Sequence, residues 1–347
     1  MHISRQCTVF IICCALLFLC ACGQRHHTVT RGFYYWKTVY GPTSTEQEVL
    51  RRLDVQRMYV RLFDVDWDVH AAEPIPVAPV RLPSRLDTAT DFVPVIFITQ
   101  LTMSHLRPAA IAALATKISG FAGAICASAD MHPAEVQIDC DWTAGTKDIY
   151  FALLRELRRQ PFFRGRLLSC TIRMHQVRYF GSSGIPPADK GMLMCYSMGD
   201  IKKPGSRNSI LDVKVAQQYM AVMNKYPLPL DIALPLFHWC ALFRDQQFRG
   251  LLHDVSPAQV AGSSVFIHKT GNLYTCLRDT VWHGYPIAAN DVIRTESVSA
   301  AELEEIARFT AKRLTKQDLN VVFFSCDSIT LAKYSTHELE TVYNTYR

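Results

Sequence analysis

Short apolar runs alternate with stretches of helical spacing along most of the chain from residue 33 onward. Eight of the runs are rich in Val, Ile, Phe and Tyr and have the length of β-strands. They cover Phe33–Tyr40, Met58–Asp66, Phe92–Gln100, Glu135–Thr143, Leu167–Gln176, Gly191–Ser197, Leu230–Phe237 and Asn320–Ser325. The helices predicted between them are Thr45–Leu53, Pro108–Ser119, Lys147–Gln160, Val213–Tyr226 and Ser299–Thr315, the last opening on a capping-box pattern.

Strands that alternate with helices are typical of parallel βαβ units, and strands apolar on both faces fit a sheet covered by helices. The pattern therefore predicts an α/β fold, with a (β/α)₈ TIM barrel as its simplest closure and a doubly wound open sheet as the alternative. Val265–Trp282 interrupts the alternation, with a Gly-Asn turn between two β-rich arms. It predicts a β-hairpin inserted before the last strand. The proline-rich stretch Glu73–Pro94 predicts a long loop after the second strand.

The composition excludes several classes of protein. The chain has 347 residues, 49% hydrophobic and 20% charged, which is too apolar for a disordered protein. One stretch only has the length and apolarity to enter a bilayer, so a polytopic membrane protein is excluded. The net charge of +6 comes without a basic run interleaved with aromatics, so we expect no nucleic-acid partner. The chain has no P-loop, dinucleotide fingerprint or nucleophile elbow, and we expect no cofactor.

The amino terminus has the features of a targeting segment. Arg5 precedes an almost wholly apolar run at 7–21, which is short for a membrane span. The run ends in Leu19-Cys20-Ala21-Cys22-Gly23, which resembles a bacterial lipoprotein signal with Cys22 as the lipidated residue. An ordinary secretory signal and an uncleaved anchor are the alternatives.

This resemblance implies a signal peptide at 1–21, a lipidated Cys22 with a tether to residue 31, and one barrel domain over 32–347. It places the protein in the bacterial cell envelope, lipid-anchored to a membrane and facing the periplasm. Of 12 cysteines, five lie within the first 22 residues, and the remaining seven form no CxxC motif. Because their number is odd, we expect mostly free, buried thiols.

The fourth predicted strand holds the most informative polar residues. Side chains two apart share one face of a strand, so Gln137, Asp139, Asp141 and Thr143 are predicted to align. Neighbours on that face are about 6–7 Å apart, and two buried carboxylates so close should couple, with one held protonated or strongly hydrogen-bonded. The alternative is structural, with one aspartate capping the following helix and the other paired with an arginine.

The segment Ile138-Asp-Cys-Asp-Trp-Thr143 is similar to the strand-four motif of family 18 glycoside hydrolases, the chitinase family. Asp139 and Asp141 match its two later aspartates, and Met194-Cys195-Tyr196 resembles its Met-x-Tyr motif. The resemblance implies a (β/α)₈ barrel in which a glutamate is the general acid and an aspartate orients the substrate's N-acetyl group. It further implies that Tyr196 holds the acetamido group.

The sequence departs from this motif at the catalytic glutamate, where Thr143 stands, and at the first aspartate, where Val136 stands. A threonine hydroxyl is too weak an acid to protonate a glycosidic oxygen at neutral pH. Either the protein is a non-hydrolysing relative, or Asp141 or another carboxylate has taken over. The strand also resembles a poorly characterised group of bacterial barrel proteins, which implies no activity.

Polar and aromatic residues at the carboxyl ends of the other strands are the candidate substrate ligands. They are Asp66, Gln100, Arg173, His175, His238 and Trp239. Arg173 is the expected partner of the strand-four carboxylates. Trp239 and Trp282 are the best candidates for stacking on sugar rings, with packing of the barrel end as the alternative.

Metal binding has weak support in the sequence. Asp64, Asp66 and Asp68 resemble part of a calcium loop but lack its glycine and distal glutamate. His175 and His238 have no HxH or HExxH spacing, so we expect no metal.

The sequence therefore predicts a lipid-anchored, glycoside hydrolase-like barrel that acts on or binds a glycan. If it is an enzyme, Asp141 is the predicted acid and base, Asp139 its electrostatic partner, and Tyr196 and Arg173 position the substrate. The alternative is a catalytically inactive carbohydrate- or cell-wall-binding lipoprotein, and a third possibility is a structural partner in an envelope complex.

Overall fold

The computed structural model describes residues 28–347 except 198, 206 and 315–317. The predicted signal peptide and Cys22 lie outside the described residues. Among those described, one helical stretch, Pro108–Ser128, has the length and apolarity to cross a membrane. Part of that stretch is buried within the protein, including Leu114, Ile118 and Ala122.

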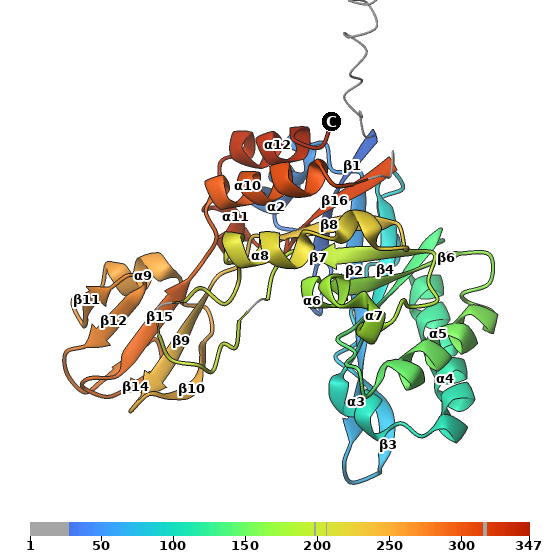
Figure 1. Ribbon diagram of the computed structural model, residues 1–347, viewed down its shortest axis with the longest axis horizontal. Coiled ribbons are helices and arrows are strands. Elements are labelled where there is room, and N and C mark those ends of the chain that lie inside the picture. Colours follow the sequence, from blue (N-terminus) through green and yellow to red (C-terminus); the bar gives the residue numbers. More distant parts are fainter. Residues whose placement is uncertain (1–27, 198, 206, 315–317) are drawn as a thin grey trace, which may run out of the picture.

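Eight parallel strands form a closed barrel, as predicted (Figure 1). They are β1 (Thr28–Tyr35), β2 (Arg57–Asp68), β4 (Asp91–Ile98), β5 (Glu135–Cys140), β6 (Leu167–Arg173), β7 (Lys190–Met194), β8 (Leu230–Pro235) and β16 (Asp318–Phe324). Because β1 pairs with both β16 and β2, the sheet closes on itself, which excludes the open-sheet alternative.

The first strand and the loop after the second strand differ from the predictions. Strand β1 begins at Thr28, so the last residues assigned to the tether belong to the barrel, where the buried Arg31 donates to the Leu53 carbonyl at 2.7 Å. The predicted loop after the second strand contains β3 (Glu73–Val77), which pairs antiparallel with the end of β2. Its prolines fit there because β3 is an edge strand, where a missing N–H costs no ladder hydrogen bond.

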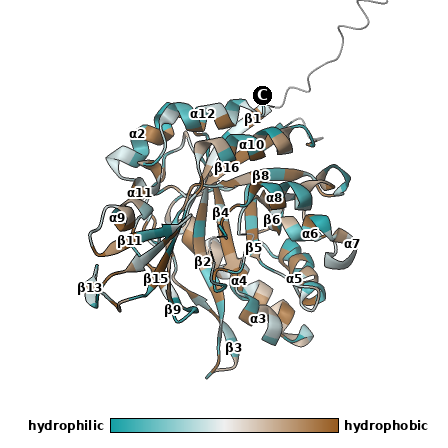
Figure 2. Cartoon of the chain, turned by 60° about the vertical axis from the view of Figure 1, so that its left-hand side comes forward, coloured by the Kyte–Doolittle hydropathy of each residue, from teal (hydrophilic) through white to brown (hydrophobic). Residues whose placement is uncertain are grey.

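The longer helices surround the barrel and include all five that were predicted. The longer ones are α2 (Ser44–Arg52), α4 (Ile111–Ser128), α5 (Lys147–Arg159), α8 (Val213–Met220), α10 (Ala300–Ala311) and α12 (Thr336–Asn344). The short ones are α3 (Gln100–His105), α6 (Met174–Arg178), α7 (Phe180–Ser183), α9 (Pro257–Ala261) and α11 (Ser328–Leu331), with 3₁₀ turns at Pro108–Ala110 and Met223–Lys225. The predicted capping box at Ser299 is present, with its hydroxyl accepting from the Glu302 N–H at 3.3 Å. The barrel strands are largely hydrophobic, whereas the helices carry both kinds of residue (Figure 2).

The predicted hairpin exists but is only part of a larger insertion. Residues 239–296 form β9 (Trp239–Arg244), β10 (Gln247–Leu252), β11 (Phe266–Thr270), β12 (Leu273–Cys276), β13 (Thr280–Trp282), β14 (Tyr285–Ile287) and β15 (Val292–Glu296). Five of these strands make an antiparallel sheet in the order β10-β9-β15-β12-β11. The insertion has its own hydrophobic cluster and projects to one side of the barrel (Figure 1).

The side chains of β5 divide between the two faces of the barrel wall. Cys140 lies on the outer, packing face, close to the helical residue Tyr150, as the alternation predicts. Gln137 and Asp139 lie on the inner face, where they contact Tyr34 and Thr171 respectively. All seven cysteines of the described chain are free and buried, which confirms the expectation for this part of the sequence.

Candidate functional site

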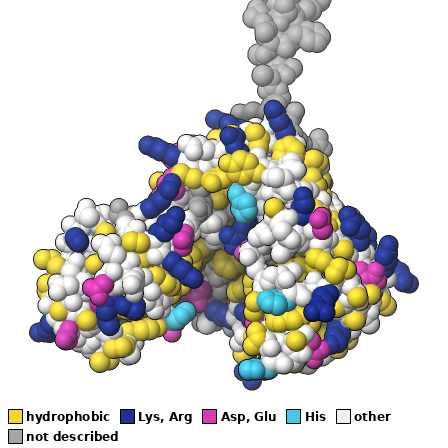
Figure 3. All heavy atoms as spheres, turned by 60° about the horizontal axis from the view of Figure 1, so that its bottom comes forward, with side chains coloured by type: hydrophobic (Ala, Val, Ile, Leu, Met, Phe, Trp, Pro, Cys, Tyr) yellow, Lys and Arg dark blue, Asp and Glu magenta, His cyan; other side chains and the backbone are white. Residues whose placement is uncertain are grey.

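We use the term barrel mouth for the carboxyl ends of the eight parallel strands and the loops that follow them. In this fold class the mouth holds the functional residues. The chain leaves the mouth after β8, builds the insertion, and returns through α10 and β16. Figure 3 shows that the molecular surface is hollowed between the insertion and the rest of the barrel.

Asp139 is a partly buried carboxyl on the inner face of β5. Its Oδ1 accepts a hydrogen bond of 2.6 Å from the Thr171 hydroxyl on the neighbouring β6. Burial raises the pKa of Asp139 to about 7, and the negative charge of Asp141 adds to the rise, while Thr171 and Arg173 oppose it. The predicted coupling of the two carboxyls is therefore present, and Asp139 is the one that keeps its proton to near neutral pH.

Asp141 lies just beyond the end of β5 and is paired with Arg173 at the end of β6. The guanidinium donates from Nε to one carboxylate oxygen and from Nη2 to the other, a bidentate pair. Gln100 donates to the main-chain carbonyl of Asp141 at 2.6 Å. The expected pairing of Arg173 with a strand-four carboxylate is thus present, and both side-chain oxygens of Asp141 are occupied by it.

Thr143 does not continue the line of inward-facing residues. Strand β5 ends at Cys140, and Thr143 is exposed in the turn before α5. Its hydroxyl lies 3.3 Å from that of Thr146. The alignment of all four predicted side chains on one strand face was therefore wrong for Thr143, because the chain leaves the extended conformation three residues before it.

Aromatic rings line the mouth on the side of β1, β7, β8 and β16. Tyr196 packs its ring against Phe237 and Phe324, at centroid distances of 5.7 and 5.5 Å. Phe324 also contacts Trp36 at 5.3 Å. Burial and the nearby charge of Asp139 raise the pKa of Tyr196, so this phenol stays protonated beside the carboxyl.

Trp239 extends this aromatic wall to the start of the insertion, with its ring 5.1 Å from that of Phe237. Its indole N–H is buried without a hydrogen-bond partner among the described residues. Two other tryptophans lie in packing positions, and one of them is Trp282, the second predicted stacking residue. Trp142 is buried against Tyr150 and donates to the Ser183 carbonyl at 3.0 Å, and Trp282 packs on Phe266 inside the insertion.

The three aspartates at the end of β2 have separate contacts. Asp64 forms an ion pair of 2.7 Å with Arg61. Asp66 accepts from the Thr99 hydroxyl at 2.8 Å and the Trp67 N–H at 2.9 Å, and Asp68 accepts from the N–H groups of the following turn. Asp66, a predicted substrate ligand, thus supports the start of α3. The described residues include no group of three His, Cys, Asp or Glu side chains arranged to hold a metal.

The two histidines occupy different parts of the mouth. The predicted fifth strand ends early, at Arg173, because Met174–Arg178 forms α6, so His175 lies on a helix. Partial desolvation and the charge of Arg173 lower the pKa of His175. His238 lies near Lys333 and Asp327 on the β16 side, where burial and Lys333 lower its pKa.

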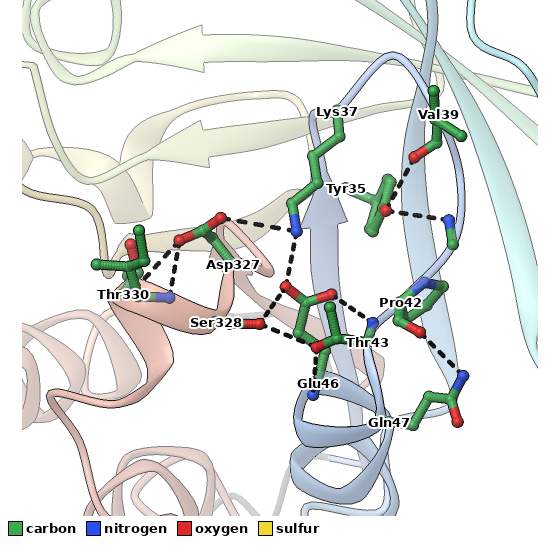
Figure 4. A network of polar contacts seen from close by, with 12 residues as sticks. Tyr35, Lys37, Val39, Pro42, Thr43, Glu46, Gln47, Asp327, Ser328 and Thr330 are labelled. Carbon is green, nitrogen blue, oxygen red and sulfur yellow. Dashed lines mark hydrogen bonds and ion pairs between the residues drawn. The ribbon is translucent and has the colours of Figure 1, made fainter. Parts of the chain in front are cut away.

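A polar network ties the loops after β1 and β16 together at the rim of the mouth (Figure 4). The buried carboxylate of Glu46 accepts from Lys37 at 2.7 Å, from the Thr43 N–H at 2.9 Å and from Ser328 at 2.8 Å. Although burial opposes ionisation, these hydrogen bonds hold the pKa of Glu46 below its usual value. The sequence contains one indication of this network, since Thr43 and Glu46 have the spacing of a capping box.

Sequence reasoning missed Thr171, Phe237 and Phe324 as members of the site. Thr171 lies two residues before Arg173 and therefore on the same strand face, which is the signal that could have identified it. Phe237 and Phe324 end apolar runs and cannot be told from core residues without the barrel closure.

No family model and no curated protein matches the sequence. Solved structures do match the fold. The Bacillus megaterium spore cortex-lytic enzyme SleL aligns with a TM-score of 0.56 at 10% identity, over 94% of this chain and 76% of that chain. The Ostrinia furnacalis Group IV chitinase, solved with allosamidin, aligns with a TM-score of 0.54 at 11% identity, over 91% of this chain and 98% of that chain. At these identities the comparison confirms the chitinase-like barrel fold.

Proposed function

We propose that the protein binds a glycan at the barrel mouth. The observation that carries the proposal is the Arg173–Asp141 pair beside Asp139, facing a wall of aromatic rings that includes Tyr196. Ligand sites combine apolar walls with a few placed polar groups, and the apolar C–H faces of sugar rings stack on aromatic side chains while their hydroxyls bond to charged groups. The similarity in fold to chitinases and to a cortex-lytic enzyme supports a glycan as the ligand.

Binding without hydrolysis fits the geometry better than the hydrolytic scheme of family 18. Asp141 has both oxygens in a bidentate pair with Arg173, so protonating it requires breaking that pair. Thr143 supplies no acid in the position of the motif glutamate. This favours the carbohydrate-binding alternative over a glycosidase in which Asp141 is the acid.

Hydrolysis is the second candidate because of one specific observation. Asp139 has a pKa of about 7, which is suited to donating or accepting a proton near neutral pH. If a glycan is cleaved, the catalytic proton would come from Asp139, with Asp141 and Arg173 as its electrostatic surroundings.

The test combines binding and turnover on one panel of chitin-type, peptidoglycan and N-glycan oligosaccharides. We expect one class to raise the melting temperature and to remain intact by mass spectrometry. Asp139→Asn should weaken that binding, whereas Asp130→Asn, the same substitution at an exposed position, should not. Cleavage abolished by Asp139→Asn would establish the second candidate, and a panel without any binding would refute the proposal.

We further propose that Cys22 carries a lipid anchor that holds the barrel at a bacterial envelope membrane, facing the periplasm. The support is the resemblance of Leu19–Gly23 to a lipoprotein signal. Cys22→Ser should abolish incorporation of labelled palmitate and move the protein from the membrane to the soluble fraction. Unchanged labelling would exclude this anchor.

A further inference from the structure

The loop between β7 and α8 is fastened to the insertion by a buried arginine. Arg294 on β15 is 2% exposed. Its guanidinium donates to the main-chain carbonyls of Lys203 at 2.6 Å, Ile201 at 2.9 Å and Gly205 at 3.3 Å. Three carbonyls of one loop thus converge on a single side chain of the insertion.

Glu296 completes this attachment two residues further along β15. One of its oxygens accepts from Arg294 Nε at 2.5 Å, and the other accepts from the N–H and the hydroxyl of Ser209, at 2.5 and 2.7 Å. Asn208 donates to the Ser297 carbonyl at 2.9 Å. A buried arginine and glutamate are costly unless their hydrogen-bonding groups find partners, so these contacts fasten the main chain at Ile201, Lys203, Gly205 and Ser209 to β15.

The same loop carries exposed cations. It leaves the carboxyl end of β7, includes Tyr196, and exposes Lys202, Lys203 and Arg207. Its acidic residues bind main-chain N–H groups, Asp200 that of Lys202 at 2.9 Å and Asp212 that of Val215 at 3.1 Å.

Arg207 lies 3.4 Å from Asp212, whereas no ion pair involves Lys202 or Lys203 within the described part of the chain. Lys and Arg side chains border the hollow on the side of the insertion (Figure 3). Since Arg294 already holds the main chain at Ile201, Lys203 and Gly205, an anion that binds these two ammonium groups need not order that part of the backbone, which lowers the entropy cost of binding.

We propose that this loop is a cationic wall of the glycan site and that the preferred glycan carries carboxylates, as acidic sugars and peptide-substituted glycans do. The inference rests on the proposed glycan binding and names its substrate class. Lys202 and Lys203 contact the anionic groups, and Arg294 is a positioning residue that acts through the loop.

The first test compares a carboxylate-bearing peptidoglycan fragment, the same fragment with its carboxylates amidated, and neutral chitotetraose by calorimetry. We expect the acidic fragment to bind about 10-fold tighter than its amidated form at low salt, as two exposed charge contacts allow. The preference should shrink as salt is raised. Lys202→Gln/Lys203→Gln should remove the preference, so that the acidic and amidated fragments bind with equal affinity.

The matched control is Lys225→Gln/Lys312→Gln, which removes two exposed lysines from segments that precede β8 and β16 and therefore lie at the other end of the barrel. Equal affinity for the acidic and amidated fragments, or a preference that survives the Lys202/Lys203 substitutions, would overturn the inference while leaving glycan binding intact. Failure of every glycan to bind would refute the proposed function itself.

The second test examines Arg294. Arg294→Lys keeps the charge but loses the planar fork that reaches several carbonyls. We expect faster hydrogen exchange in the loop and a smaller preference for the acidic fragment, with chitotetraose affinity retained. A purely structural role would instead lower the melting temperature without changing the ratio of the two affinities.

Discussion

The two ends of the barrel interior handle buried charge in opposite ways. At the amino-terminal end, Lys190 contacts Glu135 at 2.7 Å and Asp231 at 2.9 Å. Arg57 pairs with Asp91 and reaches Glu135 at 3.4 Å. Although burial lowers the pKa of Lys190, the two carboxylates outweigh it and raise that pKa. Every acidic group in this cluster therefore has a cationic partner.

At the mouth, the nearby cation Arg173 pairs with only one of the two carboxyls, Asp141. Arg173 pairs bidentately with Asp141, and Asp139 has a neutral donor, Thr171, in place of a cation. The pKa of Asp139 is about 7 as a result of burial and of the Asp141 charge. The charges at the amino-terminal end therefore stabilise the fold, whereas the mouth has a carboxyl that can change its protonation near neutral pH.

The largest expected effect comes from breaking the paired end. Lys190→Met leaves Glu135 and Asp231 without their shared ammonium and should lower the free energy of unfolding by about 3–5 kcal/mol. Lys117→Met is the control, because Lys117 forms an exposed ion pair with Glu73 at 3.1 Å and such pairs contribute about 0–1 kcal/mol. Urea unfolding measures both, and similar losses for the two variants would refute the contrast between the ends.

The second effect concerns Asp139 and depends on pH. Because its pKa in the folded protein is about 7, above the ordinary value of 3.8, folding favours the protonated form. The stability from this group is fully present below the unfolded pKa and is lost as the pH rises through 7. Asp139→Asn lacks the titration, so the wild type should lose about 2–4 kcal/mol relative to the variant between pH 4 and pH 8. A difference in unfolding free energy that is constant over this range would contradict the assignment.

A smaller effect is expected from the donor that stabilises the charged form of Asp139. Thr171→Val removes the hydroxyl but keeps the shape of the side chain. It should raise the pKa of Asp139 further, because the carboxylate loses a hydrogen bond that stabilises it by about 1.5 kcal/mol. Carbon NMR of the carboxyl follows the titration directly. Thr116→Val on the surface of α4 is the control and should leave the midpoint unchanged. A midpoint that falls in Thr171→Val would mean that the hydroxyl does not act as the donor.

The barrel itself follows from local patterns. Strands such as β4 and β8 are buried on both faces, so they appear in the sequence as apolar runs bounded by turns. The insertion was underestimated because several of its strands are short and half exposed, and Ile267 and Val281 point to solvent. A β-sheet covered on one face only gives a weak signal in single strands.

The candidate site was only partly predictable for a different reason. The spacing of Asp139 and Asp141 on one strand, and Arg173 on the next, suffices to predict a charged cluster. Which aspartate remains protonated depends on where the guanidinium fork of Arg173 points, and strand alternation does not determine that it pairs with Asp141 and not with Asp139. Sequence reasoning therefore assigned the acid to Asp141, whereas the geometry favours Asp139.

The smallest effect on stability is expected from a substitution that tests the barrel mouth directly. Thr143→Glu restores the acid residue of the chitinase motif at an exposed position, so the free energy of unfolding should change by no more than about 0.5 kcal/mol. We also expect no gain of hydrolysis on chitin-type oligosaccharides. Residue 143 lies in the turn beyond β5, with its side chain directed at Thr146, and Asp141 remains paired with Arg173. Turnover above the wild-type background would show that the site lacks only one residue. Its absence, with Thr143→Glu folded and still able to bind glycan, would show that a glutamate at position 143 is not sufficient for hydrolysis at this site.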